Sequence, residues 1–377
     1  MKTAIKVIEQ LEKAGFEAYM VGGAVRDYLL EKMPHDIDVA TNASPEQVKS
    51  LFEKTVDTGI EHGTVLVLKD GTGIEVTTYR TEGTYSDNRR PDSVEFVQSL
   101  EEDLKRRDFT INAMAMDKKM EITDPFGGAH DLEKGLIRAV GNPDERFQED
   151  ALRMLRAIRF SSQLDFQIDP ATLTSIGHQA HLIESIAIER IKSEIDKIML
   201  HEKAWRSFDY LTDTGLAQHL PSGYLFKADW TKFRPVDAAV AGWSYMLFEH
   251  MKDIEEILPY RFSNEEKQMI KRALEAARLP EWDEWVFYSY TAMQLTIAAS
   301  LQGRNADIAG QKSKLPIRNK ADMAVNGSDL MKWNSLKQGP WIKQWLAQIE
   351  RMIVFGELAN DKELIKDWFM HEYHHHQ

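Results

Sequence analysis

All of the strand-like segments of this 377-residue chain lie within roughly its first 125 residues. They are short runs that are rich in β-branched and aromatic residues or that carry an apolar residue at every second position. Almost everything after about residue 139 instead has the apolar spacing of helices. The strand-like runs span residues 16–21, 36–40, 64–68, 74–79 and 94–97. Strands that come first and helices that follow predict an α+β fold, with a mixed β-sheet flanked by helices at the N-terminus and an all-helical remainder.

Composition limits the class of protein further. The chain is long enough for about two to four domains with cores of their own. It has no cysteine, which excludes disulfides and thiolate metal sites. No apolar run approaches the length of a membrane span, and residues 1–6 open an amphipathic helix rather than a signal peptide. We therefore expect a soluble, cytoplasmic protein that makes no membrane contact.

Two adjacent glycines, Gly22 and Gly23, separate the apolar run 16–21 from a helix-like segment, Ala24 to Glu31. Because glycine has no Cβ, such a strand-to-helix turn can bring backbone N–H groups close to a triphosphate at the start of a helix. Arg26, in the first helical turn, could reach the same phosphates as a forked donor. A Gly-Gly pair alone is usually only a turn, so it indicates a phosphate site only together with further motifs.

Two carboxylates follow shortly after, at Asp36 and Asp38. On a strand their spacing of two places both on one face, while Ile37 points into the core. Glu75 could supply a third carboxylate if its strand pairs beside the first. Such hard oxygen ligands suit Mg²⁺, and two metal ions held this way would activate a 3′-hydroxyl and stabilise a pyrophosphate leaving group. An isolated Asp-x-Asp is more often a solvated strand end, but after a Gly-Gly turn it predicts nucleotide-transfer chemistry.

The charge distribution leaves the question of an RNA partner open. A net charge of −13 argues against nucleic-acid binding. Residues 311–343, however, hold seven basic residues against two acidic ones, and Trp333 and Trp341 lie among them. The basic residues are Lys312, Lys314, Arg318, Lys320, Lys332, Lys337 and Lys343. Such a segment fits an RNA-binding patch about as well as a solvated helical face with two core tryptophans.

The segment 80–91 is rich in charge and turn-forming residues and has little to bury. It contains Asp87, Arg89 and Arg90. We expect a flexible surface loop next to the strand that carries Glu75, which makes it a candidate lid or lever. Its length disfavours the alternative, an ordinary hairpin connection.

The segment 106–115 brings together Arg107, Asp108 and Asn112, which we expect within about one turn of each other on a helix. There Asp108 and Asn112 could recognise ribose hydroxyls while Arg107 meets phosphate. The alternative is an Arg–Asp ion pair at a helix start.

The segment 149–160 repeats charge at every third position. On a helix Asp150, Arg153 and Arg156 would share one slanted stripe with Arg159 at its edge. An aspartate can accept from the exocyclic amine of C or A, and an arginine can donate to acceptors on the base edge. Such a pair accepts CTP and ATP and disfavours UTP and GTP. A surface Asp–Arg pair is the alternative.

The order of these segments resembles the bacterial CCA-adding enzymes, class II tRNA nucleotidyltransferases of the DNA polymerase β superfamily, and most of all those of Bacillus-type organisms. Residues 22–27 with 36–38 resemble the family's motif A, and residues 106–115 resemble motif B. Motifs C, D and E are resembled by residues 124–138, 149–156 and 189–197. The resemblance covers nearly the whole chain, although the region after about Leu220 looks shorter than the family pattern.

The resemblance implies a seahorse-shaped molecule of four parts. These would be a catalytic nucleotidyltransferase head at 1–138, a base-recognising neck at 139–200, a helical body at 201–300 and a helical, tRNA-binding tail at 301–377. By position Asp36 and Asp38 would bind Mg²⁺, as two ions in the active complex. Gly23 and Arg26 would bind the triphosphate, and Asp150 and Arg153 the base. Positions Arg107, Arg156 and Arg159 match nucleotide-contacting residues, and Gly327–Asp329, 339–341 and Asn360 match a tail that holds the tRNA elbow.

The implied activity is a CTP/ATP:tRNA nucleotidyltransferase that adds and repairs the 3′-terminal CCA of tRNA. Its partners would be the tRNA 3′ end, CTP and ATP, with no protein partner implied. The family also contains CC-only and A-only enzymes and a poly(A) polymerase. CC-adding relatives lack part of the flexible loop, whereas residues 79–97 look complete here, which favours full CCA addition. A remote alternative is a non-catalytic RNA-binding module with the same fold.

Overall fold

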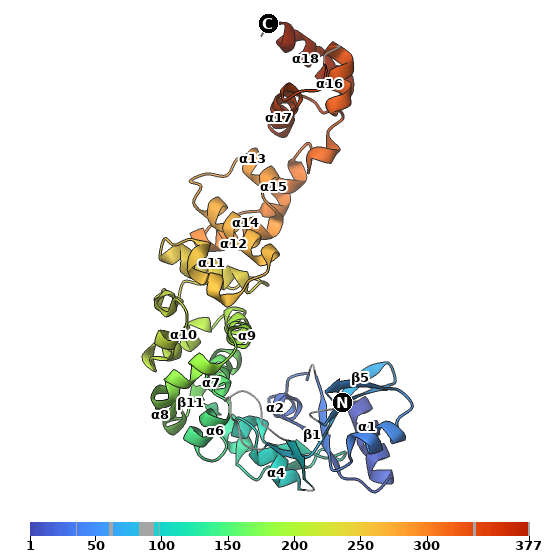
Figure 1. The fold of residues 1–377 in the computed structure, drawn as a ribbon, viewed down its shortest axis with the longest axis vertical. Coiled ribbons are helices and arrows are strands. Elements are labelled where there is room, and N and C mark those ends of the chain that lie inside the picture. Colours follow the sequence, from blue (N-terminus) through green and yellow to red (C-terminus); the bar gives the residue numbers. More distant parts are fainter. Residues whose placement is uncertain (35, 60–62, 83–93, 98, 335–336, 376–377) are drawn as a thin grey trace. The chain divides into compact units, whose positions relative to one another are not determined.

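The protein is described here from a computed structural model. The described residues are 1–34, 36–59, 63–82, 94–97, 99–334 and 337–375. They form two compact units: unit 1 comprises Met1–Lys232 and Pro259–Arg261, and unit 2 comprises Phe233–Leu258 and Phe262–Gln377 (Figure 1). Each unit is described by itself, and the finer division into four parts stays a prediction.

Unit 1 begins with a seven-stranded sheet in the order β3-β4-β5-β2-β1-β8-β9. The strands are β1 (Ala18–Val21), β2 (Asp38–Thr41), β3 (Thr55–Gly59), β4 (Thr64–Lys69), β5 (Thr72–Thr78), β8 (Ala115–Met116) and β9 (Ile122–Thr123). Only β2 and β5 run parallel, and every other pair is antiparallel. The sheet is therefore mixed, and the predicted α+β fold is confirmed.

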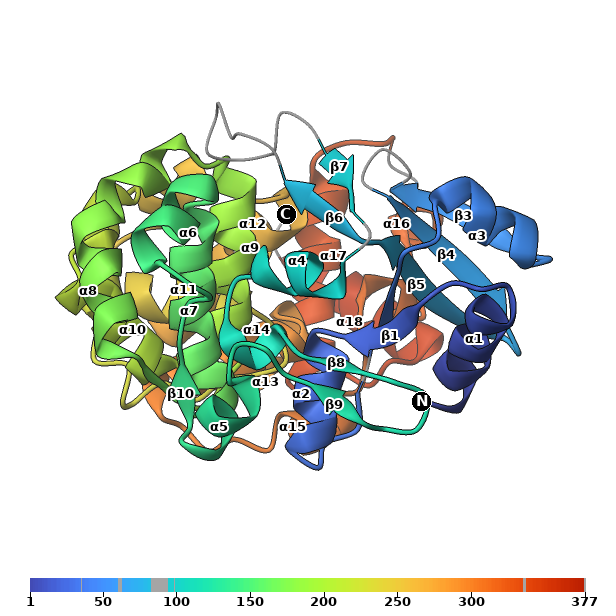
Figure 2. The ribbon, with the colours of Figure 1, turned by 90° about the horizontal axis from the view of Figure 1, so that it is seen from below.

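One face of this sheet is packed against helices α1 (Lys2–Lys13) and α3 (Pro45–Leu51) (Figure 2). Helix α1 buries Ala4, Val7, Ile8 and Leu11 at the spacing of one helical face. The strand residues directed at these helices, such as Val65 and Val76, are fully buried. Burial of alternate strand positions on this face fixes the register, and hence the side on which the polar strand residues lie.

The opposite face is covered over β1 and β2 by α4 (Leu100–Lys105), whose Leu104 packs with Val21, Ala40 and Tyr79. A separate hairpin of β6 (Arg80–Glu82) and β7 (Val94–Phe96) lies beside α4. Over the other half of this face the apolar side chains remain accessible, since Val56 is 46% and Leu68 43% exposed.

The remainder of unit 1 is mainly helical. Its helices are α2 (Gly23–Leu29), α5 (Gly128–Glu133), α6 (Pro143–Glu149), α7 (Leu152–Leu164), α8 (Pro170–Gln179), α9 (Ile188–Met199) and α10 (Ala204–Asp213). Short 3₁₀ segments are η2 (Thr110–Asn112), η3 (Ala180–Ser185), η4 (Leu216–His219) and η5 (Gly223–Lys227). Helix α7 packs against α9 and α10, and most of its residues are buried. An all-helical region after residue 139 is not quite what forms, because β10 (Leu136–Ile137) and β11 (Gln167–Ile168) pair in parallel across α6 and α7.

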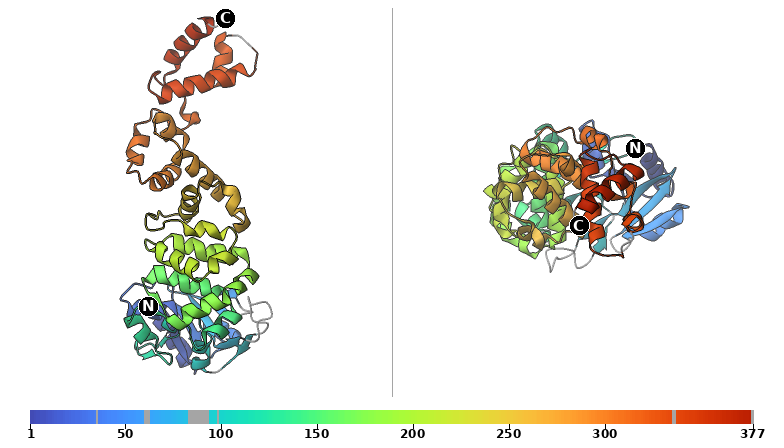
Figure 3. Two further views of the ribbon diagram at one scale, coloured as in Figure 1. Left: turned by 90° about the vertical axis from the view of Figure 1, so that its left-hand side faces the viewer. Right: turned by 90° about the horizontal axis from the view of Figure 1, so that it is seen from above.

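Unit 2 consists of helices (Figure 3). They are α11 (Val240–Glu249), α12 (Asn264–Ala277), α13 (Glu284–Ser289), α14 (Ala292–Gln302), α15 (Ile308–Lys314), α16 (Gly327–Asn334), α17 (Trp341–Val354) and α18 (Lys362–His375), with 3₁₀ segments η6 (Ile254–Tyr260) and η7 (Lys320–Asp322). Helices α12 and α14 each begin with a capping box, at Ser263 and Thr291. None of the described helices is long and apolar enough to cross a membrane.

Helices α16 to α18 share an aromatic core around the fully buried Phe369. Trp333 and Trp341 both pack on Phe369, with ring centroids 6.0 and 6.5 Å away. The core interpretation of these two tryptophans is therefore the better one. Lys312 also has a structural role, because its Nζ donates to the carbonyl oxygens of Phe287 and Tyr290.

Candidate active site

The predicted strand-to-helix turn is present between β1 and α2, which begins at Gly23 and ends at Leu29. Gly22 has a φ of +70°, in the region that favours glycine. A Cβ on Gly22 would lie 2.9 Å from Nη1 of Arg107. The turn therefore needs glycine for its backbone angle, and the absence of a Cβ leaves room for the Arg107 guanidinium where it lies.

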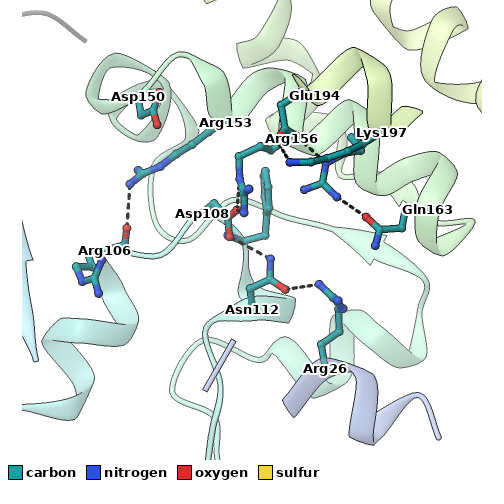
Figure 4. A network of polar contacts seen from close by, with 12 residues as sticks. Arg26, Arg106, Asp108, Asn112, Asp150, Arg153, Arg156, Gln163, Glu194 and Lys197 are labelled. Carbon is teal, nitrogen blue, oxygen red and sulfur yellow. Dashed lines mark hydrogen bonds and ion pairs between the residues drawn. The ribbon is translucent and has the colours of Figure 1, made fainter. Parts of the chain in front are cut away.

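Arg26 projects from α2 with its side chain only 8% exposed. Its Nε and Nη2 donate to Oδ1 of Asp27 at 2.9 and 2.7 Å, and its Nη1 donates to Oδ1 of Asn112 at 2.9 Å. The guanidinium also lies 5.4 Å from the ring centre of Phe160. Three hydrogen bonds and an aromatic face thus fix the direction of this arginine, which Figure 4 shows together with its partner Asn112.

The carboxylates lie at the edge where β2 begins. Asp38 pairs in register with Glu75 across the parallel strands β2 and β5. The strand β2 begins only at Asp38, so Asp36 lies two residues before it and, contrary to prediction, not on the strand. All three line one cavity of about 420 Å³. Burial raises the pKa of Asp38, and the charges of Glu75 and Asp36 raise it further against the opposing effect of Arg107. The three carboxylates that line this cavity repel one another, and a bound cation would relieve that repulsion.

These carboxylates do not form a complete metal site by themselves. In the part of the chain that the structure describes, no three His, Asp or Glu side chains are grouped closely enough to hold an ion alone. An ion bound by Asp36 and Asp38 would need further ligands, which substrate phosphates and water commonly supply to Mg²⁺.

The prediction that Arg107, Asp108 and Asn112 lie on one helix is wrong. Helix α4 ends at Lys105, the backbone is extended at Phe109, and Asn112 belongs to the short 3₁₀ segment η2. Asp108 explains the break, because its Oδ1 accepts from its neighbour's N–H, that of Phe109, at 2.8 Å. Such local side-chain to backbone bonds compete with helix formation.

The three residues nevertheless come together, in a different way. Asn112 Nδ2 donates to Oδ1 of Asp108 at 3.1 Å. Arg107 does not pair with Asp108; its Nη2 donates to the buried Asp103 at 3.1 Å. Burial would raise the pKa of Asp103, but Arg107 and Arg106 lower it below its usual value.

Asp108 forms an ion pair with Arg156 of α7 through two hydrogen bonds. Arg156 donates from Nε and Nη2 to Oδ2 of Asp108 at 2.8 and 2.6 Å. Burial alone would raise the pKa of Asp108, but Arg156 together with Asn112 lowers it to about 2. Arg26, Asn112, Asp108 and Arg156 thus form a continuous series that links α2, η2 and α7 (Figure 4).

Asp150 is not on the helix with Arg153, contrary to prediction. It lies between α6 and α7 with extended backbone angles, φ −142° and ψ 103°. Its Oδ1 accepts from the N–H of Leu152 at 3.0 Å, near the start of α7, and its Oδ2 accepts from Nη2 of Arg190 at 2.9 Å. The predicted helical stripe therefore contains only the three arginines of α7.

Arg153 is held by a different acid from the one the sequence suggested. Its Nη1 donates to Oε2 of Glu149 at 2.6 Å, and its Nη2 donates to the carbonyl oxygen of Arg106 at 3.0 Å. Asp150 is thus held by Arg190 of α9 and Arg153 by Glu149 of α6.

Arg159 is anchored on α9. Its Nε donates to Oε2 of Glu194 at 2.6 Å, and Lys197 Nζ donates to Oε1 of the same carboxylate at 3.0 Å. The Arg159 guanidinium also lies 4.1 Å from the ring centre of Phe160 and donates to Gln163. Burial of Glu194 would raise its pKa, but Arg159 and Arg156 lower it. This network attaches the end of α7 to α9.

All of the predicted nucleotide-binding residues line a single cavity of about 440 Å³. They are Gly22, Gly23, Arg26, Arg107, Asp108, Asn112, Asp150, Arg153, Arg156 and Arg159. Asp38 lines this cavity as well as the carboxylate cavity, whereas Asp36 and Glu75 line only the latter. Residues far apart in the sequence therefore converge where the glycine turn, η2 and α7 meet.

Sequence reasoning missed three residues that also line the nucleotide cavity: Arg106, Phe160 and Gln163. Gln163 follows Arg159 by one helical turn, a spacing that could have identified it. The predicted loop residues Asp87, Arg89 and Arg90 lie outside the described residues.

The tail residues singled out in the sequence make structural contacts within unit 2. Asp329 accepts from Lys362 at 2.7 Å. Asn360 accepts from the N–H of Ala324 and donates to the carbonyl oxygen of Asp322, both at 2.8 Å. The first bond joins α18 to α16, and the bonds of Asn360 join the segment before α18 to the segment before α16.

Comparisons with known proteins agree with this geometry. A family model described as "Poly A polymerase head domain" matches residues 18–138. A model described as "Probable RNA and SrmB- binding site of polymerase A" matches residues 165–224, and one for "tRNA nucleotidyltransferase domain 2" matches residues 233–369.

Individual relatives match over nearly the full chain. The CCA-adding enzyme of Ligilactobacillus salivarius is 42% identical over 97% of this chain and 95% of its own length. That of Geobacillus kaustophilus is 41% identical over 99% of this chain and 98% of its own length. The crystal structure of the Bacillus stearothermophilus CCA-adding enzyme in complex with CTP matches with a TM-score of 0.90 at 36% identity, and covers 100% of this chain and 98% of that chain. Because fold, site and near-complete relatives agree, this chain belongs to the CCA-adding enzymes, a family of tRNA nucleotidyltransferases.

Proposed function

We propose that this chain adds C, C and A to the 3′ end of tRNA from CTP and ATP, without a nucleic-acid template, and releases pyrophosphate at each addition. The observation that carries the proposal is the pair of cavities that share Asp38. One is lined by six arginines and accommodates a nucleoside triphosphate, and the other is lined by carboxylates. As the substrate is tRNA, we place the activity in the cytoplasm.

The triphosphate would bind where the glycine turn meets Arg26 and Arg107. Gly22 and Gly23 line the cavity with no side chain between their backbone and a ligand, and a forked guanidinium donor matches phosphate oxygens in geometry and charge. Since Arg26 is already held by Asp27 and Asn112, little side-chain entropy is lost when it meets the ligand.

The base would be read by Asp150 and Arg153. Cytosine and adenine both carry an exocyclic amine that Asp150 can accept from, together with ring acceptors that Arg153 can donate to. Uracil and guanine present an oxygen at the same edge, which would face the carboxylate without a proton between them. Such a mismatch places two oxygens against one another, and sites of this kind discriminate strongly.

Ribose recognition would fall mainly to Asn112. The Asp108 carboxylate already accepts four hydrogen bonds, from Phe109, Asn112 and twice from Arg156, which is its full capacity. We therefore assign Asp108 to holding Asn112 and Arg156 in place. The Asn112 amide has a second N–H and a second lone pair beyond those it uses with Asp108 and Arg26, and these suit a ribose hydroxyl.

Nucleotidyltransferases of this family use divalent metal ions, and the carboxylate cavity fits such an ion. Its described lining has three carboxylates and no basic side chain. We propose Mg²⁺, with two ions in the active complex held by Asp36, Asp38 and phosphate oxygens, and with Glu75 beside them. When bound, Mg²⁺ promotes ionisation of the attacking hydroxyl and neutralises charge on the departing pyrophosphate.

The chain's own residues determine the geometry of the transfer. The tRNA 3′-oxygen forms a bond to the α-phosphorus as the bond from that phosphorus to the pyrophosphate oxygen breaks. The hydroxyl loses its proton, and pyrophosphate leaves with the electron pair of the broken bond. Arginines on the triphosphate side hold the leaving group, so the attack must come from the carboxylate side.

The experiment supplies the protein with Mg²⁺, a tRNA transcript that ends before CCA, and CTP alone, ATP alone or both. Two residues added with CTP and three with both would support the proposal. A stop at two, a requirement for a CC-ending primer, or a long A tail would instead identify a CC-adding enzyme, an A-adding enzyme or a poly(A) polymerase. Binding of tRNA without pyrophosphate release would identify a non-catalytic module.

A further inference from the structure

Gln163 lines the nucleotide cavity but belongs to none of the motifs that the sequence identified. It lies in the last turn of α7, and its side chain is half-buried. Its amide oxygen accepts from Nη1 of Arg159, whereas Figure 4 shows no dashed bond at its amide nitrogen. No other residue in the described part of the chain forms a hydrogen bond with this side chain. Gln163 therefore keeps both N–H groups of its amide for a ligand.

Arg159 fixes the orientation of this amide. A guanidinium can only donate, so the oxygen of Gln163 faces Arg159 and the nitrogen faces away from it. Arg159 is itself held firmly, because its Nε donates to Oε2 of Glu194 at 2.6 Å and its side chain is only 8% exposed. Gln163 is therefore a pre-oriented donor at the wall of the cavity, and it loses little side-chain entropy when it binds a ligand.

The position of Gln163 along α7 indicates which part of a nucleotide it meets. Arg153, the proposed base reader, lies in the first turn of α7, ten residues before Gln163. At a rise of 1.5 Å per residue, the two positions are about 15 Å apart along the helix axis, yet both line the same cavity. A nucleoside triphosphate is an extended ligand with the base at one end and the γ-phosphate at the other. With the base at Arg153, the phosphate end is the part that reaches Gln163.

Arg26 supports this placement independently. It belongs to the helix that follows the glycine turn, and its guanidinium lies 5.4 Å from the ring centre of Phe160. The Arg159 guanidinium lies 4.1 Å from the centre of the same ring. Phe160 precedes Gln163 by about one helical turn and lines the same cavity. The proposed phosphate-binding arginine is therefore beside the C-terminal half of α7, where Gln163 lies.

On the basis of the proposed function, we propose that the Gln163 amide donates to the terminal phosphate of the incoming nucleotide and gives the site a preference for triphosphates over diphosphates. CTP and ATP share the γ-phosphate, and CDP and ADP lack it, so the contact does not depend on the base. An amide has no charge, so it adds a directional donor without adding to the repulsion among the six arginines of the cavity.

The experiment measures the dissociation constants of CTP and CDP by isothermal titration calorimetry, with Mg²⁺ and without RNA. Gln163→Glu keeps an oxygen that accepts from Arg159 but replaces the amide N–H₂ by a second acceptor. We expect the preference for triphosphate, the Kd for CDP divided by the Kd for CTP, to fall about tenfold, because a hydrogen bond to a charged group is lost. ATP and ADP should show the same fall.

Gln167→Glu is the matched control for the added charge. Gln167 is exposed on β11, four residues after Gln163, and does not line the nucleotide cavity. This substitution should leave the preference for triphosphate within about twofold of the wild type, because an exposed charge is screened by solvent. An equal fall in Gln167→Glu and Gln163→Glu would overturn the inference.

Gln163→Leu separates contact with the ligand from support of Arg159. If Gln163 acts only by holding Arg159, leucine weakens the binding of CTP and glutamate does not, and the inference is overturned. An unchanged preference in Gln163→Glu, even with weaker binding of both nucleotides, would overturn it as well. If the preference falls as expected but the wild-type protein does not extend tRNA, it is the proposed function that fails.

Discussion

Replacing Asp108 by Asn tests the series of hydrogen bonds that links α2 to α7. The substitution keeps the shape of the side chain but removes the charge that Arg156 faces. It also gives position 108 an N–H₂ group where an acceptor is needed. We expect a loss of folding stability in unit 1 and weaker nucleotide binding, because Arg156 and Asn112 lose their common anchor.

The size of the expected loss of folding stability follows from the pKa of Asp108. Its side chain is 9% exposed, and its pKa falls from 3.8 to about 2 on folding. Since one pH unit corresponds to about 1.4 kcal/mol, the charged carboxylate contributes about 2 kcal/mol at neutral pH. A pKa that is lowered on folding gives stability that is complete above pH 3.8 and is lost as the pH falls towards 2. About half of it should remain at pH 3.

The assay is pulsed hydrogen exchange along a urea titration, read by mass spectrometry on peptides from residues 100–164. This readout follows the site separately from unit 2. Wild type and Asp108→Asn should differ by about 2 kcal/mol at pH 7, and by about half as much at pH 3. In an Arg156→Gln background the same substitution should cost little, because its partner is already absent. A difference that is equal at both pH values, or equal in both backgrounds, would refute the ion-pair explanation.

Three further substitutions address the chemistry, the base choice and unit 2. Asp38→Ala should abolish incorporation of both CMP and AMP, and incorporation above about one-thousandth of the wild-type rate would contradict its assignment. Asp150→Ala should relax base choice before it removes catalysis, so the ratio of kcat/KM for CTP over UTP should fall by at least about tenfold; an unchanged ratio would exclude Asp150 as the base reader. Asn360→Ala removes two hydrogen bonds to backbone and should destabilise unit 2 by about 1–2 kcal/mol in urea unfolding, whereas an unchanged midpoint would show that water replaces both.

Periodicity and turn chemistry predicted the elements that carry the catalytic residues. Strands with several alternating positions, such as those around Asp38 and Glu75, have a clear signal because one face is buried against α1 and α3. Strands β8 to β11 have two residues each and no repeat to recognise. They form because the fold places the backbone of a partner strand beside each of them.

The helix predicted over residues 106–115 does not form, because the Asp108 side chain has two possible arrangements and the sequence does not show which one is favoured. Asp108 can either face solvent on a helix or cap its own backbone, and Arg156 favours the second arrangement from 48 residues away. The same holds for Asp150, which leaves the helix to meet Arg190. Partners of this kind are set by tertiary structure, so local patterns identify the residue types and not the pairs.

For Leu66 and Gly73, the residue type in the sequence gives no indication of a place beside a cavity. In the sequence Leu66 is one of several apolar residues in a strand and cannot be told from the core. Only the register, which places it beside Glu75 on the uncovered face, separates it from its buried neighbours Val65 and Val67. Which apolar residue of a strand lines a cavity is therefore a feature that sequence patterns alone do not reveal.

The net charge of −13 argued against a nucleic-acid substrate, and the site explains why that argument fails. All six arginines that line the nucleotide cavity have an acidic partner, so the acids that lower the net charge are the same groups that orient the cations. The pairs are Arg26–Asp27, Arg106–Asp103, Arg107–Asp103, Arg153–Glu149, Arg156–Asp108 and Arg159–Glu194. A guanidinium has five donors and uses only some of them on its acid, so the remainder can meet phosphate or base. A chain with a negative net charge can therefore hold a cluster of oriented arginines that would otherwise repel one another. The arrangement of charges at the site predicts an anionic substrate, whereas the net charge of the whole chain does not.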